Sequence, residues 1–188
     1  MGFWESTLSS AIGSFVAIIG AYGVAKWQLS KSQKQINTQF YIRFNEAQVY
    51  INQFDREVEE ILNITRGNER RFARIVLSEH NFKELKENWE IAIRIINPEI
   101  EEKELDDFVV VLSKINQNAP LDYYKELNGM IFEMAVIYNL LLKDCKYLVG
   151  DLPRKIDTGF FMNKNLTLPF MIKRFRKKYK RMKKKLKI

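Results

Sequence analysis

The sequence is poor in the residues that build disulfides, metal centres and phosphate-binding loops. It contains one cysteine, Cys145, and one histidine, His80. A single cysteine excludes a disulfide framework within the chain and fits a reducing compartment. These two residues alone cannot supply the ligand set of a metal site. The eight glycines are scattered, so no glycine-rich loop is available to hold a nucleotide phosphate. We therefore expect neither a metal nor a cofactor, and no enzymatic activity.

Charge is absent from one stretch near the N-terminus, from Ser6 to Ala25. As a helix this stretch would extend about 30 Å, which is the thickness of a bilayer's hydrocarbon core. Glu5 precedes it, whereas Lys26 and Lys31 follow it. The positive-inside rule then predicts a single-pass protein of the cell membrane, with its N-terminus outside and its C-terminus cytoplasmic. A buried core helix and a signal peptide are the alternatives.

Small side chains recur at every fourth residue of this predicted span. The row consists of Ser9, Gly13, Ala17, Ala21 and Ala25. A ridge of small residues lets two helix backbones approach closely in lipid, where no hydrophobic effect drives helices together. The ridge therefore predicts a homo-oligomer. It leaves open the number of subunits, and whether the assembled helices form a pore or only an anchor.

The rest of the sequence has the pattern of an all-α protein. Apolar residues step by three and four from Phe44 to Ile61, a rhythm typical of a coiled coil or of a long helix in a bundle. The acidic residues between 99 and 104 favour a helix that begins at Glu99. A very apolar helix follows Pro120, with a predicted buried stripe that starts at Leu121 and Tyr124. The predicted parts are a short outside end and transmembrane helix (1–27), a stalk helix (28–66), a cytoplasmic helical bundle (67–166) and a basic amphipathic helix (167–188).

The positive charge of the chain is concentrated in its last helix. The net charge is +8, yet the residues outside 173–187 carry 20 basic and 23 acidic side chains. Such asymmetry predicts a dedicated anionic partner for one segment and not a generally basic protein. The candidate binding residues are Lys173, Arg174, Arg176, Lys177, Lys178, Lys180, Arg181, Lys183, Lys184, Lys185 and Lys187.

This basic segment also carries a narrow apolar seam with steps of four and three residues: Leu168, Ile172, Phe175, Tyr179, Met182 and Leu186. A basic amphipathic helix of this kind can lie on an anionic membrane leaflet. The same cations could instead contact the phosphates of a nucleic acid. In a third interpretation the seam packs against the stalk or a partner subunit, and the charges are solvated or face the acidic patch Glu99–Asp107. The sequence leaves these three interpretations open.

One short pattern competes with the expectation of a protein without enzymatic activity. The segment from Arg74 to His80, Arg-Ile-Val-Leu-Ser-Glu-His, resembles the Arg-x(4 to 6)-His motif of the all-α HEPN ribonucleases. The resemblance implies that Arg74 would stabilise a phosphate and that His80 would act as an acid or base on RNA at a dimer interface. The sequence departs from the family pattern at Ile75, where a polar residue is usual.

The overall layout resembles small membrane-anchored abortive-infection and phage-encoded proteins of bacteria. The resemblance lies in the order of a short outside end, one span, a helical cytoplasmic body and a basic tail. It implies a membrane effector in phage–host conflict, and so a role in phage defence. The leading prediction is a self-associating membrane protein whose cytoplasmic domain senses or recruits an unidentified protein partner. The alternative is a membrane-tethered, nonspecific nucleic-acid-binding protein.

Overall fold

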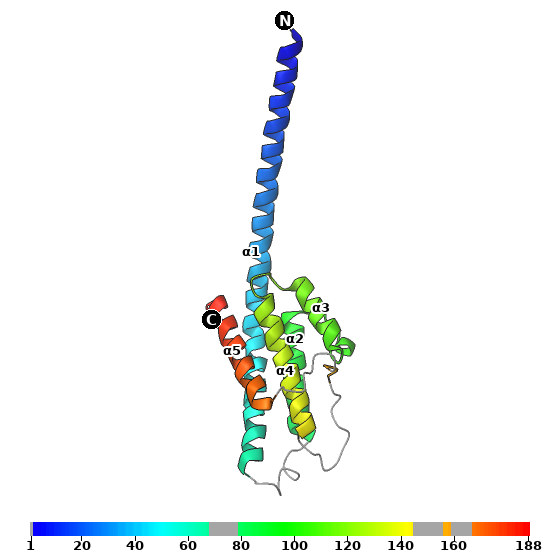
Figure 1. The fold of residues 1–188 in the computed structure, drawn as a ribbon, viewed down its shortest axis with the longest axis vertical. Helices are drawn as coiled ribbons and strands as arrows, with labels where there is room; N and C mark the ends of the chain where they lie inside the picture. The colour runs from blue at the N-terminus through cyan, green and yellow to red at the C-terminus, as the bar shows by residue number, and fades with distance from the viewer. Residues whose placement is uncertain (1, 68–78, 145–155, 159–166) are drawn as a thin grey trace. The chain divides into compact units, whose positions relative to one another are not determined.

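The computed structural model is helical in nearly all of the chain that it describes, which is residues 2–67, 79–144, 156–158 and 167–188. Side chains are described for residues 20–63, 81–143, 156–158 and 167–188. The elements shown in Figure 1 are α1 (Gly2–Gly67), α2 (Glu79–Ile96), the 3-10 helix η1 (Glu102–Glu104), α3 (Phe108–Asn118), α4 (Tyr124–Asp144) and α5 (Leu168–Leu186). The described elements confirm the all-α prediction.

The chain divides into two compact units, Met1–Gln39 and Phe40–Ile188. The first unit is the N-terminal part of α1, and its described side chains include Trp27 and Leu29, which are 63% and 71% exposed. Within the described part of the chain, no helix is both long enough and apolar enough to cross a membrane. Residues 6–19 of the predicted span lie outside the residues whose side chains are described.

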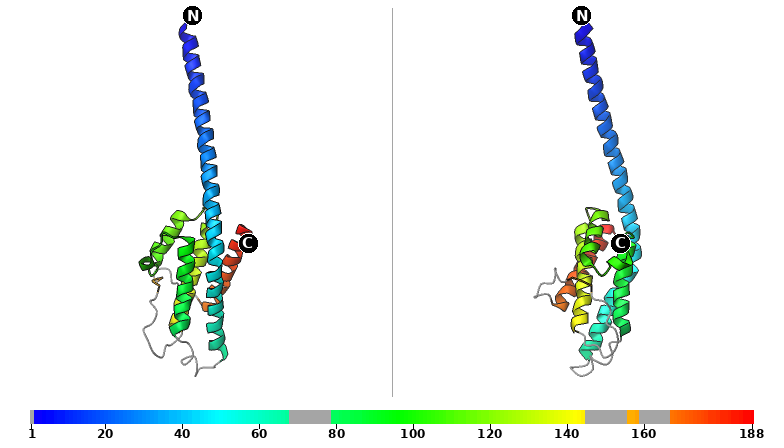
Figure 2. Two further views of the ribbon diagram at one scale, coloured as in Figure 1. Left: turned by 180° about the vertical axis from the view of Figure 1, so that it is seen from behind. Right: turned by 90° about the vertical axis from the view of Figure 1, so that its right-hand side faces the viewer.

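The second unit is a helical bundle that includes the last part of α1. The side chains of Phe44, Ile51 and Phe54 are completely buried there, together with Ile61. The three-and-four spacing therefore belongs to a helix packed inside one chain and not to a coiled coil between chains. Residues of the predicted stalk from Phe40 onward are part of this compact unit. Figure 2 shows this section of α1, drawn in cyan, among the other helices of the bundle.

The predicted helix start at Glu99 is wrong, because the acidic residues after α2 form a 3-10 turn instead. In this turn the backbone N–H of Glu101 donates to Glu104 Oε2 at 2.8 Å. The helix begins only at Phe108, where Asp107 is the N-cap. Its carboxylate accepts hydrogen bonds from the backbone N–H groups of residues 109 and 110, at 3.0 and 3.2 Å. A side chain that satisfies two free N–H groups fixes the start of a helix.

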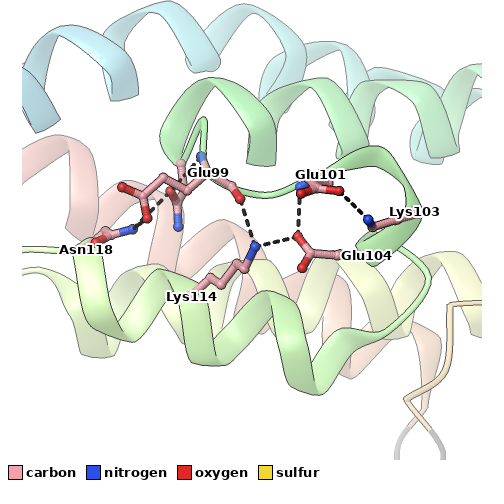
Figure 3. A network of polar contacts seen from close by, with 7 residues as sticks. Glu99, Glu101, Lys103, Glu104, Lys114 and Asn118 are labelled. Atoms are coloured by element: carbon pink, nitrogen blue, oxygen red, sulfur yellow. Dashed lines mark hydrogen bonds and ion pairs between the residues drawn. The ribbon is translucent and has the colours of Figure 1, made fainter.

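Side chains of α3 fasten this acidic turn (Figure 3). Lys114 Nζ donates to the carbonyl oxygen of Glu99 at 2.9 Å and to Glu104 Oε2 at 2.6 Å. Asn118 Nδ2 donates to Glu99 Oε2 at 2.7 Å. Lys103 pairs with Glu101 at 2.7 Å. The acidic patch is thus satisfied by its immediate neighbours in the fold.

The buried stripe of α4 begins later than predicted. Leu121 and Tyr124 precede or open the helix and are 81% and 42% exposed, whereas Leu127 is completely buried. Further along α4, the buried Asn139 donates from Nδ2 to the carbonyl oxygen of Ile156 and to Thr158 Oγ1, both at 2.7 Å. These bonds hold residues 156–158 against the bundle. Buried polar groups that find partners in this way avoid a large desolvation penalty.

The packing of α5 on α1 generates a first prediction. Phe175 of α5 is buried, and its ring lies edge-on to Phe54 with centroids 5.9 Å apart. We expect Phe175→Ala to lower the free energy of unfolding by about 3–5 kcal/mol. The matched control is Phe170→Ala on the same helix, since Phe170 is 49% exposed and contacts Arg174 through a cation–π interaction worth about 1 kcal/mol or less. Urea denaturation of the full chain in detergent, followed by circular dichroism, measures both; equal losses would contradict the described packing.

Candidate anion-binding site

The basic helix α5 begins and ends at residues that suit helix termini. Thr167 is the N-cap in an extended conformation, and Pro169 lies in the first turn, where its missing N–H group is not needed. At the other end Lys187 adopts a left-handed conformation with φ of 59°. The N–H of Ile188 then donates to the carbonyl oxygen of Lys183 at 3.1 Å. This bond satisfies one of the free carbonyls that a helix end leaves.

The apolar seam of α5 is occupied within the chain. Ile172, Phe175, Met182 and Leu186 are buried in the core of the bundle. Tyr179 is half-buried and donates its hydroxyl to Asn52 Oδ1 of α1 at 2.9 Å. Desolvation by burial raises the pKa of Tyr179 to about 12, so this phenol stays protonated at neutral pH. The structure therefore favours the interpretation in which the seam packs on the protein itself.

A first row of α5 cations faces α1. Arg176 Nε donates to Asp55 Oδ1 at 2.9 Å and to Asp55 Oδ2 at 3.2 Å. Its Nη2 also pairs with Glu59 at 2.5 Å. Lys183, two turns further along, lies 5.6 Å from the ring centroid of Tyr179. Arg176 thereby bridges two acidic side chains of α1, Asp55 and Glu59.

A second row of α5 cations faces α4. Arg174 Nε and Lys178 Nζ form ion pairs with Glu133 Oε1 at 2.8 and 2.7 Å. Lys185 Nζ pairs with Glu126 at 2.9 Å. The hydrogen bond from Lys185 lowers the pKa of Glu126. All of these pairs join acidic residues of α4 to basic residues of α5, so they also set the register between the two helices.

Glu133 is the unusual member of this row, because its carboxylate is completely buried. Its Oε2 atom has no hydrogen-bond partner within the described residues. Desolvation by burial raises the pKa of Glu133, although Lys178 and Arg174 both favour the charged form. Lys178 reaches the carboxylate across Gly129, one helical turn earlier on α4, where a Cβ atom would overlap the end of the lysine side chain. A side chain at position 129 would therefore require the end of Lys178 to move.

The remaining cations of α5 form a third row that points away from the bundle. They are exposed and have no ion pair within the described part of the chain: Lys173, Lys177, Lys180, Arg181, Lys184 and Lys187. Most of them follow one another at steps of four and three, on the side of the helix opposite the seam. From residue 173 to residue 187 this outward row extends about 21 Å. The predicted eleven-residue site thus separates into five cations held against the bundle and six that are available to a partner.

The acidic patch at residues 99–107 plays no part in this site. Among the described residues, its members pair with Lys86, Lys103 and Lys114 and not with α5. The interpretation in which the α5 charges face this patch is therefore wrong for the described contacts. The acidic partners are Asp55, Glu59, Glu126 and Glu133 instead.

Other predicted site residues lie partly outside the described residues. Of the small-residue ridge in α1, Ala21 and Ala25 are exposed, while the side chains of the three earlier members are not described. Arg74 and Cys145 lie outside the described residues altogether, and His80 belongs to α2 without a described side chain. The HEPN-like pairing thus stays a prediction. In the described part of the chain, no group of three or more His, Cys, Asp or Glu side chains could hold a metal ion.

No protein family, curated protein or solved structure matches this chain.

The buried carboxylate generates a prediction about pH. A folded-state pKa raised above the ordinary value of 4.5 means that folding favours the protonated form of Glu133. Its contribution to stability is then fully present below pH 4.5 and is lost as the pH rises through the raised pKa. We expect the free energy of unfolding of the wild type, relative to Glu133→Gln, to decrease as the pH is raised from 4.5 towards neutrality.

The matched control is Glu104→Gln, because the hydrogen bond from Lys114 lowers the pKa of Glu104. The contribution of Glu104 to stability is present above pH 4.5 and is lost as the pH falls. The free energy of unfolding of the wild type, relative to Glu104→Gln, should therefore increase as the pH is raised. Chemical denaturation at a series of pH values measures both curves. Curves of the same slope for the two variants would contradict the buried state of Glu133.

Proposed function

We propose that this chain is a single-pass membrane protein, with its N-terminus outside, that self-associates and presents a helical domain in the cytoplasm. The observation that carries the proposal is the uncharged stretch Ser6–Ala25 inside α1, which is helical from Gly2 to Gly67. A continuous helix satisfies its own backbone hydrogen bonds, as a lipid environment requires. An aromatic ring and a cation meet just after the stretch, with Lys31 Nζ 5.3 Å from the ring centroid of Trp27. Such residues are typical of a membrane–water interface.

Self-association is supported by the small-residue ridge and by the exposure of unit 1. Of the ridge residues whose side chains the structure describes, Ala21 and Ala25 are both exposed. A second copy of the helix could therefore approach this face closely, and packing of this kind is what drives helices together in lipid.

The cytoplasmic domain recruits an anionic partner in this proposal. The outward row of α5 supports that role, since its cations have no ion pair among the described residues. By analogy with the layout of abortive-infection proteins, the whole would act as a membrane effector in phage–host conflict. Recruitment of the partner would bring it to the membrane surface, where the self-associated chains are held.

The ridge generates the test of the proposal. Replacing Gly13 and Ala17 by leucine should reduce crosslinked oligomers in native membranes severalfold, since bulky side chains separate the helix backbones. The control replaces Ile12 and Ile19 by leucine, which changes the same helix off the ridge and should leave oligomers intact. Alkaline extraction should leave both variants in the membrane. An unchanged oligomer in the first variant, or release of the parent chain by extraction, would contradict the proposal.

A second candidate function is nonspecific binding of nucleic acid at the membrane, which the outward row also favours. Binding through phosphate contacts releases counterions and weakens steeply with salt. The test replaces Lys177, Lys180 and Lys184 by glutamine, because deleting α5 would remove part of the core. The slope of log affinity against log salt should then fall by roughly 2–3. The control replaces Lys83, Lys125 and Lys143, which are exposed elsewhere on the bundle; an equal loss in both variants, or binding that is insensitive to salt, would contradict this function.

A further inference from the structure

We propose that the outward row of α5 binds the anionic phospholipid headgroups of the leaflet at which the predicted span ends. This inference rests on the membrane anchoring proposed above and deepens it by naming the partner of the cationic site. The binding surface consists of the same cations: Lys173, Lys177, Lys180, Arg181, Lys184 and Lys187.

The charge distribution around the row is the first argument. No acidic residue occurs from Lys173 to Ile188. Four acidic residues on the helices beside α5 are paired with its other cations: Asp55 and Glu59 with Arg176, Glu133 with Arg174 and Lys178, and Glu126 with Lys185. These four carboxylates therefore do not cancel the field of the outward row. Each cation held near an anionic leaflet strengthens binding roughly fivefold.

The direction of α5 within the bundle is the second argument. Arg176 contacts Asp55 of α1, and Tyr179 contacts Asn52. Tyr179 also lies 6.4 Å from Phe44, measured between ring centroids. As residue numbers rise along α5 they fall along α1, so the two helices are antiparallel. The C-terminal end of α5 consequently points towards the part of α1 at which the second unit begins.

Contacts at that end of the bundle agree with this direction. Lys185 Nζ donates to the carbonyl oxygen of Asp122 at 2.9 Å. The next residue, Tyr123, stacks on Phe40 with ring centroids 5.4 Å apart. Phe40 is the first residue of the second unit. The end of α5 that carries Lys184 and Lys187 is therefore beside the point at which the chain arrives from the predicted span.

The length of the connection is the third argument. Fourteen residues lie between Ala25, the end of the predicted span, and Phe40. As a helix, the chain extends about 22 Å from residue 25 to residue 40. A connection of this length keeps the cationic row near one leaflet. A nucleic acid would have to arrive from solution without that advantage.

The buried seam determines the character of the contact. Phe175 and Met182 are occupied in the core, so α5 cannot insert an apolar face between the lipids while it stays docked. Only the cations meet the headgroups. Binding of this kind is electrostatic, and it should require anionic lipid and weaken as salt screens the charges.

The test uses the full chain reconstituted into vesicles of phosphatidylcholine alone or of phosphatidylcholine mixed with phosphatidylglycerol. An amine-reactive reagent labels the lysines at low salt, and mass spectrometry reads each site. We expect labelling of Lys177, Lys180 and Lys184 to fall about fivefold in the anionic vesicles and to recover at high salt. Two exposed lysines elsewhere on the bundle serve as internal controls and should be labelled equally in both vesicles: Lys83 and Lys143.

Alkaline extraction of the same vesicles separates the two possible failures. Equal labelling of the outward row in both vesicles, with the chain retained, would overturn lipid binding and leave the anchoring intact. Release of the chain from both vesicles would overturn the anchoring, and the inference with it. Protection of the row by an added oligonucleotide in neutral vesicles, without protection by anionic lipid, would assign the site to nucleic acid and overturn the inference.

Discussion

The bundle depends on the docking of α5 across α1 and α4. Its seam brings Phe175 against Phe54, and the completely buried Glu133 holds two of its cations. Burial of large apolar side chains such as Phe175 provides most of the favourable free energy of this contact. A buried ion pair adds little net stability, because removing the charges from water costs about as much as their attraction returns. We infer that Glu133 chiefly determines how α5 is rotated on its neighbours.

That rotation has a direct consequence for the surface of the molecule. With the seam inward, Arg176 meets Asp55, and Lys178 meets Glu133. The positions opposite the seam, such as Lys177 and Lys184, then have to point outward. The sequence of α5 is basic along its whole length, but its cations form two sets. One set contacts the bundle and stabilises the fold, and the other remains available to an anionic partner. The same docking also removes the apolar seam from any partner, which makes the outer face purely electrostatic.

Much of the fold follows from apolar periodicity in the sequence. The steps of three and four from Phe44 to Ile61 predicted one buried face, and these residues are buried. The apolar seam of α5 was visible in the sequence, but the spacing left open whether it meets lipid or packs on the protein; most of it is buried in the bundle. The predicted start at Glu99 was wrong because the acidic side chains bond the nearby backbone and Lys114 instead of opening a helix. Leu121 was assigned to the core because its spacing fits the apolar stripe of α4. It precedes the start of the helix at Tyr124, so the helical spacing does not apply to it.

The sequence predicted the candidate site as a charged segment. It did not predict which of its cations pair within the bundle and which point outward. Which cations pair depends on Asp55 and Glu126, which are far from α5 in sequence and adjacent only in the fold. The position of Glu133 could have been noticed in the sequence, because it is an acidic residue between the apolar Phe132 and Met134. Placing a charge at such a core position requires a partner from another element.

Amide hydrogen exchange of the full chain in detergent tests the docking of α5 most directly. A docked helix that supplies part of the core exchanges only when the bundle opens, whereas a free basic tail exchanges at the rate of a frayed helix. We predict that the amides of residues 175–186 are protected to the same degree as those of residues 130–141 in α4. Rapid exchange throughout α5, with α4 still protected, would contradict the account.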